Sequence, residues 1–524
     1  MKRALILLPL SAGALIISFA PFSLAPLAWI ALIPLLFALE GRGKKSAFLT
    51  GLAWGLLFFT GTVYWVIHSM YYYGGVPAFI GSLVLVLLAL YMSLYPALFG
   101  FVLSMTRQQE PLVRVITVAS LWVALEYVRG VLFTGFPWVA LGYSQASLTS
   151  LIQIADITGV EGVSFIVVAF NATLYWIITA VVGNKRVPRR LIILLISLVI
   201  VPALYGVIKT ARVEERMEGW EMQRAGLAQG NIDQDLKWVP SMQQQTVAIY
   251  YSLSRTAVKD GAQLVLWPET AVPFFLQNRN HISEMALDAA RDTGTPIITG
   301  SPAYRRGTKG GKDVEHFNSA FLITSEGEIG GRYDKVHLVP FGEYVPLKKL
   351  LFFISKLTEG VGDFSAGTTI VPLTVRPRAA KEPPRDGTVR VGTLICFESI
   401  FPELARGMVN NGANILAVMT NDGWFGRTSA PYQHFDMSVF RAVENRIYLL
   451  RAANTGISGF VDPTGKVIAR SALFTRATLV EDVGLKSGPP TLYTTYGDVF
   501  PLICLIFAPL SILTARRGTR HYSN

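Results

Sequence analysis

The sequence predicts an α/β domain inserted into a helical membrane domain. Hydrophobic residues make up 51% of the 524 residues and charged residues only 16%, a composition typical of integral membrane proteins. Apolar segments of nearly membrane-spanning length fill most of residues 1–212 and recur near the C-terminus. Residues 213–490 instead alternate short apolar runs with amphipathic stretches, as the strands and helices of an α/β sheet do.

Eight segments are candidates for membrane-spanning helices, each of which needs about 20 mostly apolar residues. They are residues 4–20, 24–39, 48–68, 77–104, 112–129, 158–182, 191–208 and 496–515. Residues 1–20 also resemble a secretory signal peptide. Because further spans follow at once, we expect an uncleaved first helix. The predicted domains are therefore 1–212 with seven spans, a polar domain over 213–490, and a last span with its tail over 491–524.

The basic residues gather in short segments between these spans. They are Lys2, Arg3, Arg42, Lys44, Lys45, Arg107, Arg114, Lys185, Arg186, Arg189, Arg190, Arg516, Arg517 and Arg520. Once Glu40 and Glu110 are subtracted, these residues account for the whole net charge of +12. If eight spans alternate from an inside N-terminus, every basic cluster faces the cytoplasm, as the positive-inside rule requires.

This charge pattern predicts a location as well as a topology. Both termini are expected in the cytoplasm and the polar domain outside it, which in a Gram-negative cell means an inner-membrane protein with a periplasmic domain. A basic excess confined to loops between spans also argues against a nucleic-acid partner.

Within the polar domain, strands are predicted at 262–267, 296–300, 389–395 and 414–419, and helices at 281–293 and 434–453. The Pro-, Arg- and Ala-rich stretch 376–388 is predicted to be a loop. The two cysteines form no disulfide framework, since Cys504 lies in the last span and Cys396 in the polar domain.

Cys396 is the candidate nucleophile. It follows the predicted strand 389–395, at a point where a helix is expected to begin. Such a turn exposes the side chain, and its backbone N–H groups can hold an oxyanion. A buried structural cysteine also fits this position, but the neighbouring Glu398 and two further motifs favour the nucleophile.

The first of these motifs is Leu-Trp-Pro-Glu-Thr at 266–270, which contains Glu269. An apolar setting disfavours a charged carboxylate and so makes it a better base, able to take the proton of a thiol. Seen alone, Glu269 also fits a helix start or a surface ion pair.

The second motif is the segment Tyr-Asp-Lys-Val-His-Leu-Val-Pro-Phe-Gly-Glu-Tyr-Val-Pro at 333–346, which contains Lys335 and Glu343. An ammonium group fixed beside a thiolate stabilises a tetrahedral oxyanion. Glu343 can orient Lys335 or assist the base. The alternatives are a solvated lysine and a loop-capping carboxylate. With Cys396, the two motifs supply what acyl transfer through a thioester needs.

Other site types have less support. His337 and His434 leave a Cys–His protease arrangement open, whereas no His/Cys cluster has metal-ligand spacing and no glycine-rich phosphate loop appears. We therefore predict no metal and no cofactor. Trp238 and Trp424 suit a lipid-facing cleft, and the basic, apolar segment 347–357 suits a membrane-facing lid, with core packing as the alternative.

The triad Glu269, Lys335 and Cys396, each in its motif, resembles that of the nitrilase superfamily, which implies an α-β-β-α sandwich. Trp-Pro-Glu-Thr at 267–270, the segment 333–346, Ile-Cys-Phe-Glu-Ser at 395–399 and Asn-Asp-Gly-Trp-Phe-Gly at 421–426 are similar to the apolipoprotein N-acyltransferase family. The order of seven helices, a nitrilase-like domain and one last helix is similar too. Phe397 departs from the family pattern, in which a Tyr is common after the nucleophile.

The resemblance implies a reaction in two steps. Cys396 takes an acyl chain from a phospholipid, typically the sn-1 chain of phosphatidylethanolamine, and passes it to the α-amine of a diacylglyceryl-cysteine at the N-terminus of an apolipoprotein. Glu269 is then the general base and acid, and Lys335 stabilises the oxyanion. Glu343 and Glu398 support the site. Trp238 and Trp424 help to gate or line the lipid cleft, and Tyr344 and Phe397 are further substrate-binding residues. Nothing in the sequence demands more than a monomer.

Two other functions remain possible from the residues alone. A membrane-anchored amidase acting on a soluble amide would use the same triad, but eight spans exceed what an anchor needs. A transporter or scaffold would place ionisable residues inside spans, whereas these spans are nearly uncharged except for Glu126 and Arg129 near one end.

Overall fold

A computed structural model describes residues 2–106, 109–306, 314–344, 364–376 and 388–520. The chain divides into two compact units. One comprises Met1–Ile67, Ala78–Arg212 and Thr491–Asn524, and the other comprises His68–Pro77 and Val213–Pro490. The predicted lid at 347–357, with most of the predicted loop 376–388, lies outside the described residues.

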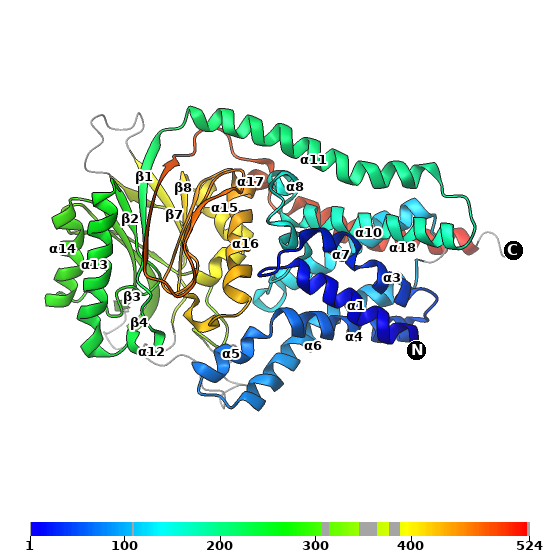
Figure 1. Cartoon of the computed structure of the whole chain (residues 1–524), viewed down its shortest axis with the longest axis horizontal. Helices are drawn as coiled ribbons and strands as arrows, with labels where there is room; N and C mark the ends of the chain where they lie inside the picture. The colour runs from blue at the N-terminus through cyan, green and yellow to red at the C-terminus, as the bar shows by residue number, and fades with distance from the viewer. Residues whose placement is uncertain (1, 107–108, 307–313, 345–363, 377–387, 521–524) are drawn as a thin grey trace. The chain divides into compact units, whose positions relative to one another are not determined.

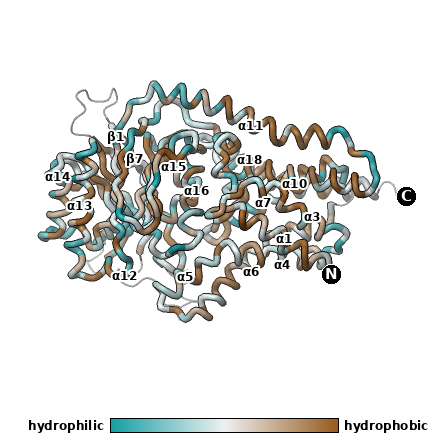
Figure 2. Tube along the Cα trace, in the orientation of Figure 1, coloured by the Kyte–Doolittle hydropathy of each residue, from teal (hydrophilic) through white to brown (hydrophobic). Residues whose placement is uncertain are grey.

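The first unit is helical. Its longer helices are α1 (Lys2–Ser18), α3 (Ile33–Leu39), α4 (Lys44–Thr62), α6 (Ala78–Leu103), α7 (Pro111–Val131), α10 (Val160–Val182), α11 (Arg189–Glu218), which continues into the second unit, and α18 (Val499–Arg520). Short helices connect them: α2 (Ala28–Ala31), α8 (Thr149–Ile152), α9 (Ala155–Thr158) and α17 (Leu492–Tyr496), with 3₁₀ turns at Ala25–Leu27, Leu132–Thr134 and Leu141–Gln145. Figure 2 shows α6, α10 and much of α11 as largely hydrophobic.

Among the described residues, four helices are long and apolar enough to cross a membrane: Ala78–Leu103, Pro111–Thr134, Val160–Val182 and Arg189–Glu218. A fifth span results if α4 and α5 (Trp65–Tyr72), which are bent by 52°, count as one. The chain is thus a membrane protein with four or five candidate spans, and the structure supports the prediction of eight only in part.

The other predicted spans appear as shorter apolar helices at Ala4–Ser18, Ala25–Leu39 and Val499–Leu513. The second of these is interrupted, because Pro26 and Pro34 each stand in the first turn of a new helical segment. Proline is favoured there since its missing N–H would have no partner within the helix. Composition alone did not reveal these breaks.

The second unit contains two six-stranded sheets. The first has the order β12 (Ala477–Gly484), β1 (Met222–Gln229), β2 (Leu264–Leu266), β3 (Ile297–Arg306), β4 (Val314–Ile323) and β5 (Ile329–Asp334). The second has the order β11 (Val467–Arg470), β10 (Gly459–Val461), β9 (Leu449–Ala453), β8 (Ile415–Thr420), β7 (Val389–Ile395) and β6 (Leu373–Val375). In both sheets the central strands pair in parallel and the edge strands antiparallel.

Helices cover the outer face of each sheet, which gives four layers (Figure 1). α13 (Gln243–Lys259) and α14 (His281–Thr293) lie against the first sheet, and α15 (Pro402–Asn410) and α16 (Ala430–Asn445) against the second. The short segments α12 (Gln234–Lys237), Pro240–Met242, Cys396–Ile400 and Asp422–Phe425 follow strands or precede helices. An α-β-β-α sandwich is therefore present.

The predicted helix 434–453 was wrong at its C-terminal end. α16 ends at Asn445, and the apolar run after it forms β9. The boundary is Arg446, whose φ of 49° places it in the left-handed region that ends helices. A short apolar run fits a buried helix and a buried strand equally well.

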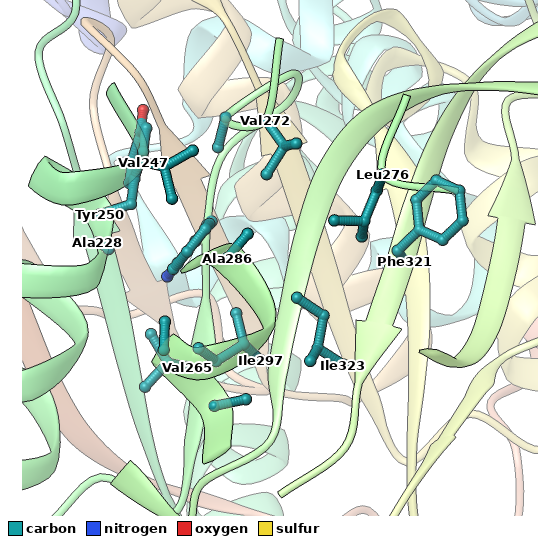
Figure 3. Packing of buried hydrophobic residues seen from close by; sticks show 14 of the residues in the cluster. Ala228, Val247, Tyr250, Val265, Val272, Leu276, Ala286, Ile297, Phe321 and Ile323 are labelled. Carbon is teal, nitrogen blue, oxygen red and sulfur yellow. The ribbon is translucent and has the colours of Figure 1, made fainter. Parts of the chain in front are cut away.

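Buried apolar side chains between the first sheet and its helices form the core nearest to Glu269. Figure 3 shows Tyr250 and Val247 of α13, Ala286 of α14 and Val265 and Ile297 of the sheet within one cluster. Trp267 stacks on Tyr250 at 5.3 Å between ring centroids, and its Nε1 donates to Ser254 Oγ at 2.8 Å. The residue two positions before Glu269 is thus fixed in the core.

Candidate active site

Glu269 lies in the turn that follows β2. The residue is 7% exposed. Its Oε1 accepts from Asn318 Nδ2 at 2.7 Å, and its Oε2 accepts from the backbone N–H of Asn421 at 3.0 Å. One oxygen is therefore held by the first sheet and the other by the loop after β8.

Lys335 directly follows β5, and its backbone N–H donates to the Asn318 carbonyl oxygen at 2.9 Å. The side chain is 1% exposed. Its Nζ lies 2.9 Å from both carboxylate oxygens of Glu343 and 3.9 Å from Glu269 Oε1. Glu343 is thus the closer charge partner of Lys335.

Asn318 joins the two carboxylates. Its Nδ2 donates to Glu269 Oε1 at 2.7 Å and to Glu343 Oε1 at 2.9 Å. Two carboxylates at such short range repel one another, and a shared amide donor with a nearby ammonium offsets that repulsion.

Cys396 is the first residue of the 3₁₀ turn after β7. Its φ of 52° lies in the left-handed region, which non-glycine residues rarely adopt. Such strain persists only where surrounding contacts impose it, and it is common at active sites. Here the Cys396 carbonyl oxygen accepts from Ser399 Oγ at 2.9 Å, and His434 Nε2 lies 3.2 Å from the same oxygen.

Glu398 connects the Cys396 turn to the segment that carries Lys335. The side chain is fully buried. Oε1 accepts from Tyr333 Oη at 2.9 Å and from the Val336 N–H at 2.7 Å, and Oε2 accepts from the Ile395 N–H at 2.7 Å. Glu398 therefore links the end of β5 to the end of β7 through hydrogen bonds.

Burial and charge set the protonation behaviour of the triad residues. Burial raises the pKa of Glu269, against the lowering effect of Lys335. Burial also raises the pKa of the Cys396 thiol, and Glu269 adds to this while Lys335 opposes it. Burial would lower the pKa of Lys335, but Glu343 and Glu269 outweigh it and raise that pKa above its ordinary value. The Cys396 thiol is therefore neutral at rest, and Lys335 favours the ionised form of Glu269 against the effect of burial.

Glu398 titrates higher than an ordinary carboxyl group. Burial raises its pKa to about 7, and hydrogen bonds from the Ile395 and Val336 N–H groups act in the opposite direction.

A buried polar network lies beneath the Cys396 turn. Asp422 Oδ1 is 3.0 Å from His434 Nδ1, and Asp422 Oδ2 accepts from Arg451 Nη2 at 3.0 Å. Burial would raise the pKa of Asp422, but Arg451 and His434 outweigh it and hold that pKa well below its usual range. Burial and Arg451 lower the pKa of His434. A neutral His434 and an ionised Asp422 therefore support the Cys396 backbone.

The predicted histidines occupy different places. His434 contacts the Cys396 carbonyl oxygen, and His337 stacks on Phe401 at 3.8 Å between ring centroids. β5 ends at Asp334, so Lys335 and His337 both lie beyond the end of the strand.

The four aromatic residues predicted to bind substrate are all half-buried. Trp424 has its ring edge-on to Tyr73 at 5.3 Å, and its carbonyl oxygen accepts from Ser69 Oγ at 2.8 Å. Phe397 lies edge-on to Phe401 at 5.1 Å. Trp238 caps α12 and Tyr344 pairs through its backbone with the segment that begins at Pro340.

Four polar residues of the site were not singled out from the sequence: Lys237, Asn318, Asn421 and Asp422. Asn421 and Asp422 belong to the motif Asn-Asp-Gly-Trp-Phe-Gly at 421–426, and Lys237 adjoins Trp238. Their positions in the sequence therefore indicated that they lie near the site. Asn318 had none that a single sequence reveals, because its role depends on β4 lying beside β3 and β5.

Comparison with known proteins agrees with the two-part architecture. Residues 11–173 match the model described as apolipoprotein N-acyltransferase N-terminal domain, and residues 224–489 match carbon-nitrogen hydrolase. The apolipoprotein N-acyltransferase of Geobacter metallireducens is 42% identical over 99% of this chain and 97% of its own. That of Methylococcus capsulatus is 34% identical over 98% and 96%.

Among solved structures, an amidase of the nitrilase superfamily from Nesterenkonia is 22% identical, with a TM-score of 0.36, over 50% of this chain and 90% of its own. On the full-length relatives and the two matching domain models, the chain belongs to the apolipoprotein N-acyltransferase family of the nitrilase superfamily.

Proposed function

We propose that this protein transfers a fatty acyl chain from a phospholipid to the N-terminal α-amine of diacylglyceryl-cysteine in an apolipoprotein, with Cys396 as nucleophile. Family membership over the full length supports the N-acyltransferase activity. The observation that carries the assignment of the nucleophile is the strained turn at Cys396. The charges of Glu269 and Lys335 both act on the pKa of its thiol.

In the first half-reaction, Glu269 takes the thiol proton and the sulfur attacks the carbonyl carbon of a phospholipid ester. The carbonyl π electrons move to oxygen, and the resulting oxyanion is stabilised by the ammonium of Lys335 and by backbone N–H groups of the Cys396 turn. The C–O ester bond then breaks, and Glu269 returns its proton to the departing lysophospholipid oxygen. The product is a thioester on Cys396.

In the second half-reaction, the α-amine of the acceptor attacks the thioester. Glu269 accepts a proton from the attacking nitrogen, an amide forms, and the C–S bond breaks. The thiolate regains its proton from Glu269. The first product leaves before the second substrate reacts, so this scheme predicts ping-pong kinetics.

The supporting residues have distinct proposed roles. Glu343 holds the Lys335 ammonium at 2.9 Å, and Glu398 braces the nucleophile turn through its buried hydrogen bonds. Trp238, Trp424, Tyr344 and Phe397 are proposed to contact the lipid substrates. A phosphatidylethanolamine donor and a monomeric enzyme complete the proposal.

The membrane arrangement is also part of the proposal. Four or five candidate spans come from helix length and composition. We infer that the shorter apolar helices complete eight spans, that the domain at 213–490 lies in the periplasm, and that both termini are cytoplasmic. The basic clusters between spans support this inner-membrane orientation.

The test is an acyl-transfer assay with full-length protein in micelles containing phosphatidylethanolamine. A synthetic diacylglyceryl-cysteine peptide with a free α-amine should gain one acyl chain, whereas the same peptide with an acetylated amine should gain none. Cys396→Ala should abolish transfer, and Cys504→Ala is the matched control that should retain it. Release of free fatty acid with no acylated peptide, or turnover of a soluble amide without lipid, would instead identify a hydrolase.

A further inference from the structure

Lys237 is a second buried lysine in the active-site region, and the acyl-transfer scheme has not used it. It is the last residue of α12 and is 0% exposed. Its Nζ donates to the backbone carbonyl oxygen of Glu269 at 3.0 Å. No other hydrogen bond of this ammonium is recorded among the residues that the structure describes, so a charged group is held in the interior by a neutral oxygen.

Burying an ammonium group is costly unless nearby negative charge compensates it. Burial lowers the pKa of Lys237 to about 8, while the charges of Glu269 and Cys396 act to raise it. The negative charges that act on Lys237 are thus those of the proposed base and the proposed nucleophile. On α12 itself, Asp235 and the adjoining Asp233 are exposed to solvent.

The charge count of the site explains why a second cation is useful. Glu269 and Glu343 are two carboxylates, and Lys335 lies 1.0 Å nearer to Glu343 than to Glu269, at 2.9 Å against 3.9 Å. Among Glu269, Glu343 and Lys335, one negative charge is therefore left uncompensated. A charged Lys237 balances it, and the balance persists when the thiol proton moves to Glu269, since the negative charge only moves from oxygen to sulfur.

We propose that Lys237 is a positioning residue that holds the Glu269 backbone and supplies the second positive charge that keeps Glu269 ionised and favours the Cys396 thiolate. This role rests on the proposed function and acts through Glu269 and Cys396. Removing the charge makes both anions less favourable. The ionisation of Glu269 then requires a higher pH, and acyl-enzyme formation slows.

The experiment measures the rate of acyl-enzyme formation from phosphatidylethanolamine against pH, without an acceptor peptide, by intact-protein mass spectrometry. Wild type should show a bell-shaped profile, with an acidic limb from Glu269 and a basic limb near pH 8 from Lys237. Lys237→Met keeps the length of the side chain but removes its charge. Its acidic limb should move up by about 1 pH unit, the size of shift that an opposite charge at close range produces, and its basic limb near pH 8 should disappear.

Lys237→Arg tests the charge separately from the fold. Arginine stays charged across this range, so the acidic limb should stay at the wild-type position while the limb near pH 8 disappears. Lys259→Met, at the exposed end of α13, is the matched control and should keep the wild-type profile. Thermal unfolding of each variant reports whether it is folded.

The outcomes separate this inference from the proposed function. If wild type forms no adduct on Cys396, the proposed function fails. If wild type forms the adduct and folded Lys237→Met keeps both limbs in place, Lys237 has no electrostatic role and the inference is wrong. Should Lys237→Met fail to fold, the profile of Lys237→Arg decides, because retention of a limb near pH 8 would contradict the assignment of that limb to Lys237.

Discussion

Asn318 is a neutral residue that hydrogen-bonds to two carboxylates of the candidate site. Its one amide group donates to both Glu269 and Glu343, at 2.7 and 2.9 Å. Hydrogen bonds to charged groups contribute about 1.5–3 kcal/mol each. Burial already raises the pKa of Glu269. Glu269 can act as a base only when it is ionised, and these donors stabilise the ionised form.

Asn318→Ala should therefore slow acyl-enzyme formation by about 10- to 100-fold, because two carboxylates lose the donor that they share. Asn318→Asp should be slower still, since it places a third negative charge between them. The matched control is Asn278→Ala, in an exposed turn of the same domain. Equal rates for Asn318→Ala and wild type would show that the bridge does not affect the base.

At the scale of elements, strand ends and the turns after them position the three candidate catalytic residues. Thr270, directly after Glu269, has a φ of 47°, and Cys396 has a φ of 52°. Gly300 of β3 allows the turn with Glu269 to approach closely, because a Cβ atom there would lie 2.4 Å from the Thr270 nitrogen and 2.7 Å from Glu269 Cα.

Gly300→Ala should push the turn at 268–270 away from β3. Overpacking of this kind costs about 1–3 kcal/mol, and the displacement of Glu269 should lower the rate of acyl-enzyme formation more than the loss of stability alone explains. Gly219→Ala is the control, since its Cβ atom would meet only the Arg216 carbonyl oxygen, at 3.7 Å. Thermal unfolding and the adduct assay check both variants, and a fully active Gly300→Ala would contradict the close-approach argument.

The network of Asp422, His434 and Arg451 predicts an acid dependence of stability. The folded-state pKa of Asp422 lies below its ordinary value. Its contribution is therefore fully present above the unfolded-state pKa of about 3.9 and is lost as pH falls through the folded-state value. Asp422→Asn leaves Arg451 buried without a charge partner and should cost about 3–5 kcal/mol at pH 7.

The stability gap between wild type and Asp422→Asn should narrow as pH falls below about 4. Denaturant unfolding at a series of pH values measures it. Asp260→Asn, at the exposed end of α13, should track wild type at every pH. A gap that stays constant with pH would mean that Asp422 is not ionised in the fold.

Periodicity located several elements closely. The predicted strand 389–395 is β7 and the predicted helix 281–293 is α14. These predictions were accurate because the first apolar pattern is typical of a strand and the second of an amphipathic helix. Short strands such as β10 and β11 were not predicted, since three or four residues carry too little pattern. The hydrogen bonds of Glu269 to Asn318 and Asn421 link residues 49 and 152 positions apart, and no local pattern fixes such contacts.

At the scale of the whole molecule, the charge distribution and the family membership both indicate a membrane protein with a separate catalytic domain. Basic segments separate the apolar helices, and the two matching domain models cover residues 11–173 and 224–489. The number of spans was less predictable, because hydrophobic composition does not reveal proline breaks or bends such as the 52° angle between α4 and α5.

The topology is tested with single cysteines introduced into a Cys396→Ser, Cys504→Ala background. In spheroplasts with an intact inner membrane, a membrane-impermeant maleimide should label Asp260→Cys, in the proposed periplasmic domain. It should not label Lys185→Cys, in a proposed cytoplasmic loop, until the membrane is permeabilised. Labelling of both, or the reverse pattern, would overturn the orientation.

The most direct test of the central claim is intact-protein mass spectrometry of wild type and Cys396→Ala after incubation with phosphatidylethanolamine. We predict a mass gain of one fatty acyl chain that hydroxylamine removes, in wild type only. An equal adduct on Cys396→Ala, or no adduct on a preparation that acylates the lipopeptide, would contradict the thioester mechanism.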